Sequence, residues 1–177
     1  MQILVADDHK LVRDGLKPFL HELDGSAEIL DASTLSEALA AAAQAPSLGL
    51  ILLDLMMPGM DGLKGLEAVR KQFPAVPVVI VSGFSTRDHV VAAVQAGAAG
   101  FIPKTVSGAA MVNALRLVLS GEKYLPSSTF FEEATQAPMM PRPVTPTRTG
   151  EIPAPFDKLS RRESEILALL VEGRTNK

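Results

Sequence analysis

Short apolar runs recur along the first 125 positions and alternate with stretches that have helical periodicity. The runs lie at positions 3–6, 27–30, 50–53, 78–81 and 101–102. Three of them are apolar on both faces, as expected of strands buried between two layers of helices. The alternation predicts βαβ units around a parallel sheet. We therefore expect an α/β fold, a doubly wound (βα)5 domain with a five-stranded parallel sheet.

The segments between these runs carry helix start signals and apolar stripes. Thr34 and Ser85 each precede an acidic residue by three positions, which places a hydroxyl where it can accept from free backbone N–H groups. Pro18 lacks an N–H, so we expect a kink or a missing hydrogen bond in the first helix. The predicted apolar stripe of that helix consists of Leu11, Leu16, Phe19, Leu20 and Leu23. A fifth helix is expected over 111–119.

The amino-acid composition of the chain changes after position 125. Seven of the 13 prolines lie between positions 126 and 155. This composition predicts a linker over 126–156. A capping box at Ser160 and Glu163 then opens an amphipathic helix. We therefore expect a domain over 1–125, the linker, and the start of an all-α domain over 157–177.

Charge and composition limit the possible functions. The net charge is −3, from 17 basic and 20 acidic residues, so the chain has no overall positive field for binding nucleic acid. The absence of cysteine fits a reducing compartment. Asp7, Asp8 and Lys10 interrupt any secretory signal, and the apolar runs are too short to span a bilayer. We expect a soluble cytoplasmic protein without membrane contact.

Polar residues follow four of the predicted strands. They are Asp7, Asp8, Asp54, Ser82 and Lys104. The carboxyl ends of parallel strands meet at one edge of a sheet, so these residues converge if the strand order is flavodoxin-like. Three carboxylates in one place repel each other unless a divalent cation or Lys104 offsets their charge. Such oxygen ligands suit Mg²⁺, and a carboxylate held beside the ion can attack phosphorus to form an acyl phosphate.

Single residues of these types have simpler explanations. A lone aspartate at a strand end is usually a helix cap or a turn residue, and we interpret Asp31 and Asp61 in this way. His9, His21 and His89 lack metal-ligand spacing and are expected on the surface. The joint acidic pattern favours a functional site.

Four segments together resemble the receiver domain of response regulators. They are VADDH at 5–9, LDLMMPGMDG at 53–62, VSG at 81–83 and GFIPK at 100–104, and the resemblance covers about 1–125. It implies that Asp54 is the phosphoacceptor. It also implies that Asp7, Asp8 and Asp54 hold Mg²⁺ together with the backbone carbonyl of Met56.

The same resemblance implies a switch. Ser82 matches the switch hydroxyl, Phe101 the switch aromatic residue, and Lys104 the lysine that neutralises the phosphoryl oxygens. Phosphorylation is expected to draw Ser82 inward and to leave space into which the Phe101 ring turns from solvent. The partners implied are a sensor histidine kinase and, on activation, a second copy of the chain.

The C-terminal segment 159–177 is similar to the opening of a LuxR-type helix-turn-helix, which points to the NarL branch of the family. The recognition helix that reads DNA should follow it. We therefore expect the intact protein to regulate transcription. We also expect this chain to be a truncated form that does not bind DNA sequence-specifically.

Two other functions are weighed against this one. A Mg²⁺-dependent phosphohydrolase of the haloacid dehalogenase type needs a second acid two positions after its nucleophile, and Met56 stands there. A receiver that acts through protein contacts without phosphorylation usually lacks part of the acidic set, which is complete here. We do not expect an enzyme, beyond self-phosphorylation from a small donor and slow loss of that phosphoryl group.

Overall fold

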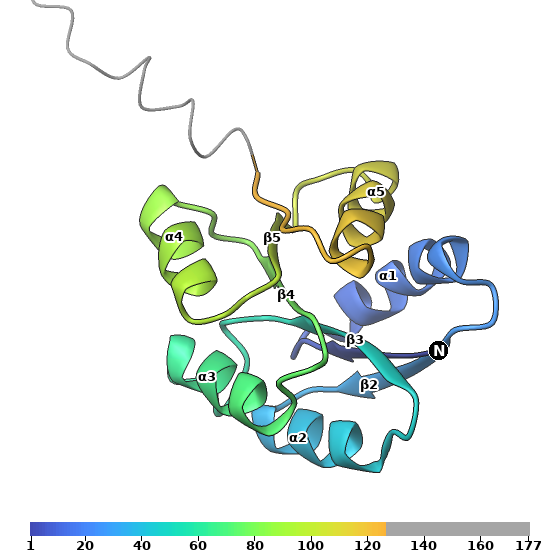
Figure 1. The fold of residues 1–177 in the computed structure, drawn as a ribbon, viewed down its shortest axis with the longest axis horizontal. Coiled ribbons are helices and arrows are strands. Elements are labelled where there is room, and N and C mark those ends of the chain that lie inside the picture. The colour runs from blue at the N-terminus through green and yellow to red at the C-terminus, as the bar shows by residue number, and fades with distance from the viewer. Residues whose placement is uncertain (127–177) are drawn as a thin grey trace, which may run out of the picture. The chain divides into compact units, whose positions relative to one another are not determined.

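Strands and helices alternate through the part of the chain that this computed structural model describes, residues 1–126. In order they are β1 (Gln2–Ala6), α1 (Lys10–Leu23), β2 (Glu28–Ala32), α2 (Leu35–Gln44), β3 (Leu48–Leu53), α3 (Leu63–Gln72), β4 (Val78–Ser82), α4 (Arg87–Gln95), β5 (Gly100–Pro103) and α5 (Gly108–Leu119) (Figure 1). The linker and helix-turn-helix predictions fall on residues 127–177, outside the described residues. Within the described part, no helix is both long and apolar enough to cross a membrane.

The five strands form one parallel sheet in the order β2-β1-β3-β4-β5. This confirms the predicted doubly wound fold and its flavodoxin-like strand order. β1 and β3 are neighbours, and the N–H of Asp54 donates to the carbonyl of Ala6 at 2.8 Å. The polar residues that follow β1 and β3 therefore leave the sheet side by side.

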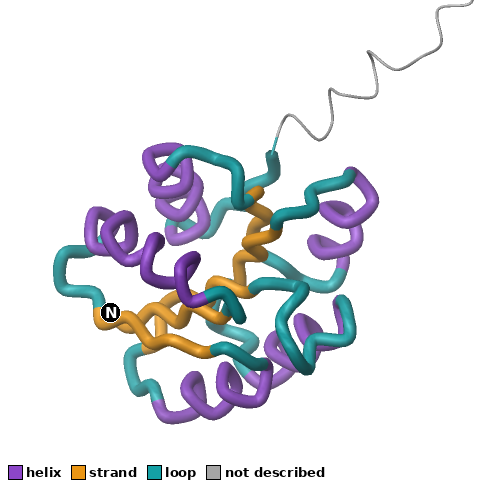
Figure 2. Tube along the Cα trace, turned by 180° about the vertical axis from the view of Figure 1, so that it is seen from behind, coloured by secondary structure: helices purple, strands orange, loops and turns teal. Residues whose placement is uncertain are grey.

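Alternating side chains of each central strand build two separate apolar cores. On β1, Ile3 and Val5 belong to a core that also takes in residues of α1 and α5, whereas Leu4 and Ala6 belong to a core with residues of α2, α3 and α4. Figures 1 and 2 show the helices on both sides of the sheet. Burial on both faces explains why the central strands lack period-2 polarity.

The predicted start of α2 was correct, whereas the predicted start of α4 was one residue too early. Thr34 caps α2, and its hydroxyl accepts from the N–H of Glu37 at 3.2 Å. The prediction that Ser85 begins α4 was wrong, because Thr86 is the cap and accepts from the N–H of His89 at 3.4 Å. Both residues have a hydroxyl suited to capping, but only Ser85 has an acid three positions later, so the sequence favoured the wrong one.

The predicted stripe of α1 was wrong at Leu11, which is 88% exposed. The buried positions are Leu16 and Leu20. Leu11 precedes Leu16 by five positions, which on a helix of 3.6 residues per turn rotates it away from the buried face. α1 runs unbroken through Pro18, which is exposed. β2 ends at Ala32, two residues beyond the predicted run.

Two glycines allow the packing to be tested. A Cβ on Gly65 would lie 2.5 Å from Met60 Sδ and 2.9 Å from the Met60 carbonyl oxygen. A Cβ on Gly15 in α1 would meet nothing within 4 Å. Gly65→Ala is therefore expected to lower the free energy of unfolding by about 1–3 kcal/mol.

The matched change Gly15→Ala should raise the free energy of unfolding by about 0.5–1 kcal/mol, because it removes backbone entropy from an open helix position. Urea denaturation followed by circular dichroism measures both variants. Stabilisation by both substitutions would contradict the close approach of α3 to Met60.

Candidate functional site

The carboxyl edge of the sheet brings the three predicted acids together. Ligand atoms of Asp7, Asp8 and Asp54 and a ring nitrogen of His9 all lie within 4.8 Å of one another. A backbone hydrogen bond ties the end of β1 to β2, because the N–H of Asp7 donates to the carbonyl of Ala32 at 3.0 Å. Asp7 and Asp54 are buried, whereas Asp8 is partly exposed. The convergence expected from the strand ends is therefore present.

Lys104 reaches this cluster from the end of β5. Its Nζ lies 2.6 Å from Asp7 Oδ2 and 3.0 Å from Asp54 Oδ2. Burial alone would lower the pKa of Lys104, but hydrogen bonds and charges from Asp7 and Asp54 outweigh burial and raise it. Lys104 therefore stays an ammonium ion and ties two buried carboxylates together.

The remaining carboxylate contacts come from the backbone. Asp7 Oδ1 accepts from the N–H of His9 at 2.8 Å, and Asp54 Oδ1 accepts from the N–H of Met56 at 3.3 Å. A cavity of about 260 Å³ opens beside Asp54 and Lys104. Three hard carboxylate ligands beside such an opening fit a divalent cation that keeps part of its water. The site is thus an acidic cluster with the donor set of a divalent-cation site.

Ser82 and Phe101 lie on the two strands next to this cluster. Ser82 is buried, and its Oγ accepts from the N–H of Phe84 at 3.2 Å. The Phe101 ring is fully buried in the core beneath α2, α3 and α4. This differs from the solvent-exposed starting position that we expected, because a phenyl ring has no hydroxyl to hydrate. The rotation of the ring stays a prediction.

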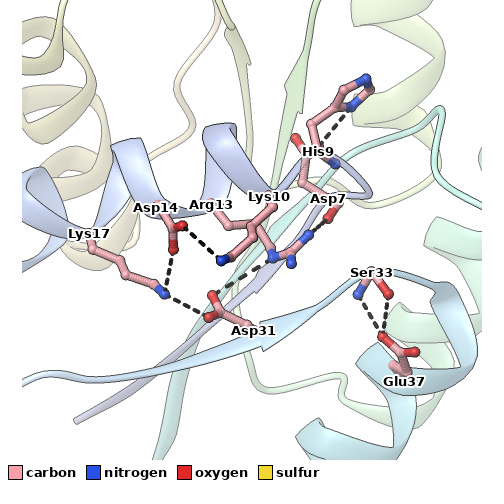
Figure 3. Close-up of polar contacts among 9 residues, drawn as sticks. All are labelled: Asp7, His9, Lys10, Arg13, Asp14, Lys17, Asp31, Ser33 and Glu37. Atoms are coloured by element: carbon pink, nitrogen blue, oxygen red, sulfur yellow. Dashed lines mark hydrogen bonds and ion pairs between the residues drawn. The ribbon is translucent and has the colours of Figure 1, made fainter.

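Sequence reasoning missed the place of His9 in the site. The ring is 66% exposed, as predicted for a surface histidine. Its Nδ1 nevertheless lies 2.7 Å from Asp8 Oδ1. The same nitrogen lies 3.2 Å from Asp7 Oδ1 (Figure 3). The signal in the sequence was its position directly after the acid pair. His89 instead lines a largely apolar cavity of about 510 Å³ that Ser82 also lines.

Arg13 was also missed. Its Nη1 donates to the backbone carbonyl of Asp7 at 2.5 Å. Arg13 precedes Leu16 and Leu20 by three and seven positions, so it shares the buried face of α1. A charged residue on an apolar helix face was the signal that would have found it.

Comparison with known proteins agrees with this geometry. The glycerol metabolism activator of Pseudomonas putida is 34% identical over 176 residues, which cover 99% of this chain and 78% of that protein. The transcriptional regulatory protein LiaR of Bacillus subtilis (strain 168) is 32% identical over 177 residues, covering 100% of this chain and 79% of that protein.

A solved structure shows the same fold at similar identity. A LuxR family DNA-binding response regulator from Silicibacter pomeroyi is 34% identical with a TM-score of 0.64, covering 72% of this chain and 98% of that one. Residues 3–116 match the family model of the response regulator receiver domain. The chain therefore belongs to the response regulators of the LuxR/NarL type.

Proposed function

We propose that this response regulator accepts a phosphoryl group on Asp54 from a sensor histidine kinase. The observation that supports this most is the Lys104 ammonium, which contacts both Asp54 and Asp7. Asp54 is buried, yet it lies beside an open cavity. A carboxylate that is held by a cation and reachable from solvent is suited to act as a nucleophile.

The transfer is a displacement at phosphorus. An oxygen of Asp54 forms the new P–O bond while the P–N bond of the donor phosphohistidine breaks, and the electron pair stays on the departing imidazole. Lys104 neutralises charge on the transferred phosphoryl oxygens. Asp7, Asp8, Asp54 and the carbonyl of Met56 would hold Mg²⁺, which when bound supplies further positive charge to those oxygens.

The switch proposed from the family also has a physical basis here. The Ser82 hydroxyl would donate to a phosphoryl oxygen while its Oγ still accepts from the N–H of Phe84, so a movement of Ser82 toward that oxygen would pull on the backbone at Phe84. The loop between β4 and α4 would therefore respond to phosphorylation. Phe101, from β5, is the aromatic residue that this movement would affect.

The output of this signal is regulation of transcription. A transcriptional regulatory protein and a DNA-binding response regulator, as their names describe them, are both similar to this chain over most of its length. They support a receiver domain over 1–125, a linker over 126–156 and the start of a DNA-binding domain over 157–177. Dimerisation on activation and a cytoplasmic location are part of this proposal.

The alternatives lack comparable support. Response regulators act as regulators, not as classical enzymes, so a phosphohydrolase is not favoured. Met56, where that class needs an acid, is 67% exposed and apolar. Self-phosphorylation from small donors and slow dephosphorylation are the only chemistry proposed.

Phosphorylation can be tested on the full 177-residue chain. With Mg²⁺ and a small acyl phosphate donor, intact-mass spectrometry is expected to show one added phosphoryl group. Asp54→Asn should show none, because the amide is a poor nucleophile. Asp61→Asn is the matched control, since Asp61 pairs with exposed Lys64 and asparagine also tolerates its φ of 45°. Labelling that persists in Asp54→Asn would defeat the assignment.

The charge balance of the site can be tested through stability. Lys104→Met leaves Asp7 and Asp54 buried without their shared cation. Without divalent ions, the free energy of unfolding at neutral pH is expected to fall by about 1–3 kcal/mol. Added Mg²⁺ should restore part of it, because the ion binds the folded state.

The pH dependence of this difference follows from the pKa of Lys104, which folding raises. Its contribution is complete below the ordinary lysine pKa and is lost as pH rises through the higher folded pKa. The stability gap between wild type and Lys104→Met should therefore be constant around neutral pH and shrink only in strong alkali. Urea unfolding at a series of pH values measures it. Lys64→Met, on the surface, should change little, and an equal effect of both variants would contradict the prediction.

A further inference from the structure

Arg13 contacts the backbone of the acid pair Asp7–Asp8 and approaches Asp31 on the edge strand β2. Its Nη1 donates to the carbonyl of Asp7 at 2.5 Å, and its Nε lies 4.0 Å from Asp31 Oδ1 (Figure 3). The side chain is only 14% exposed. Among the described residues, the buried Nε has no hydrogen-bond partner. The guanidinium is thus largely removed from water.

Stability alone does not explain such a residue. Arg13 shares the face of α1 that buries Leu16 and Leu20, where an apolar side chain would lose no hydration. Burying a charge is costly, and an apolar replacement of a buried ion pair is often neutral or stabilising. The buried Nε lacks a hydrogen bond, which adds to this cost. A buried charge at this position is better explained by what it does to the peptide that it contacts.

The contacted peptide is the one that joins Asp7 to Asp8. The N–H of Asp7 donates to the carbonyl of Ala32 on β2. The carbonyl of Asp7 accepts from Arg13. These two contacts fix the backbone from which the Asp8 side chain departs. The Asp8 carboxylate itself contacts the His9 ring, which is mostly exposed and holds it weakly. The direction of Asp8 therefore depends on the backbone and, through it, on Arg13.

Asp31 lies near both Arg13 and Lys17, so Lys17 is a natural comparison for Arg13. Asp31 Oδ2 accepts from Lys17 Nζ at 2.7 Å, and Lys17 also donates to Asp14 at 3.0 Å (Figure 3). The hydrogen bond to Asp31, aided by the one to Asp14, raises the pKa of Lys17. Lys17 and Arg13 thus carry the same charge, lie on the same helix and approach the same carboxylate. Of the two, Arg13 is the one that hydrogen-bonds the Asp7 carbonyl.

We propose that Arg13 is a positioning residue for the metal site. By holding the carbonyl of Asp7, it orients the Asp7–Asp8 peptide so that both carboxylates face the cation. This inference rests on the proposed function of the acidic cluster as a Mg²⁺ site. A hydrogen-bonded group behind the ligands typically determines a large part of metal affinity.

The test compares Arg13→Met with Lys17→Met in the full chain. Each removes one positive charge near Asp31, but only Arg13→Met removes the hydrogen bond to Asp7. Mg²⁺ affinity is measured by calorimetry, because the chain has no tryptophan to report binding by fluorescence. Arg13→Met is expected to weaken Mg²⁺ binding roughly tenfold. Lys17→Met is expected to change it less than about twofold.

A second readout separates positioning from loss of structure. With a small acyl phosphate donor, the Mg²⁺ concentration for half-maximal phosphorylation should rise in Arg13→Met by the same factor. The rate at saturating Mg²⁺ should stay close to that of wild type, because no group that touches the phosphoryl oxygens has changed. A lower rate at saturation with unchanged Mg²⁺ dependence would overturn the proposal.

The outcomes distinguish this inference from the function on which it rests. If wild type binds no Mg²⁺, the proposed metal site fails and this inference with it. If wild type binds Mg²⁺ and the two variants bind it equally well, the inference alone is overturned. Should Arg13→Met fail to fold by circular dichroism, Arg13→Lys replaces it, with weaker binding again expected because an ammonium lacks the planar fork of guanidinium. Binding by Arg13→Lys equal to that of Lys17→Met would likewise overturn it.

Discussion

Mutual repulsion among three carboxylates at one edge of the sheet is the constraint around which this receiver domain is organised. Asp7, Asp8 and Asp54 converge there, and the Lys104 ammonium contacts two of them. Three negative charges and one positive charge leave the cluster with an excess of negative charge. This excess of negative charge favours the binding of a divalent cation at the edge, because the cation lowers the electrostatic energy of the carboxylates.

The sheet order makes this arrangement possible. β1 and β3 are adjacent, so their terminal acids leave the sheet together, and β4 separates β3 from β5. Lys104 reaches back across β4, where Ser82 ends the strand. The Lys104 ammonium therefore contacts acids from both β1 and β3, at 2.6 Å from Asp7 and 3.0 Å from Asp54. Two apolar cores, one on each face, hold these strands rigidly enough for charges to be kept close together.

The fold and the acids were predictable because both leave periodic signals. Doubly buried strands are apolar throughout, and a polar residue directly after such a strand can only lie at the sheet edge. The contributions of His9 and Arg13 were not predictable in this way, because they depend on where a side chain turns after leaving the backbone. For Phe101 the expected exposure was wrong, since burial of its ring depends on packing beneath three helices.

Several departures from local sequence rules lie at the carboxyl edge of the sheet. Asp61 has a positive φ of 45°, and the exposed apolar side chains of Met56 and Phe84 line the cavity beside Asp54. Buried charges at Asp7, Asp54 and Arg13 add further unfavourable terms. The buried charges oppose folding, so their presence at this edge is explained by function and not by stability. The ordinary packing of the two cores offsets their cost. The strand pattern therefore predicts both the scaffold and the acids at its edge, whereas the contacts of His9 and Arg13 follow only from the structure.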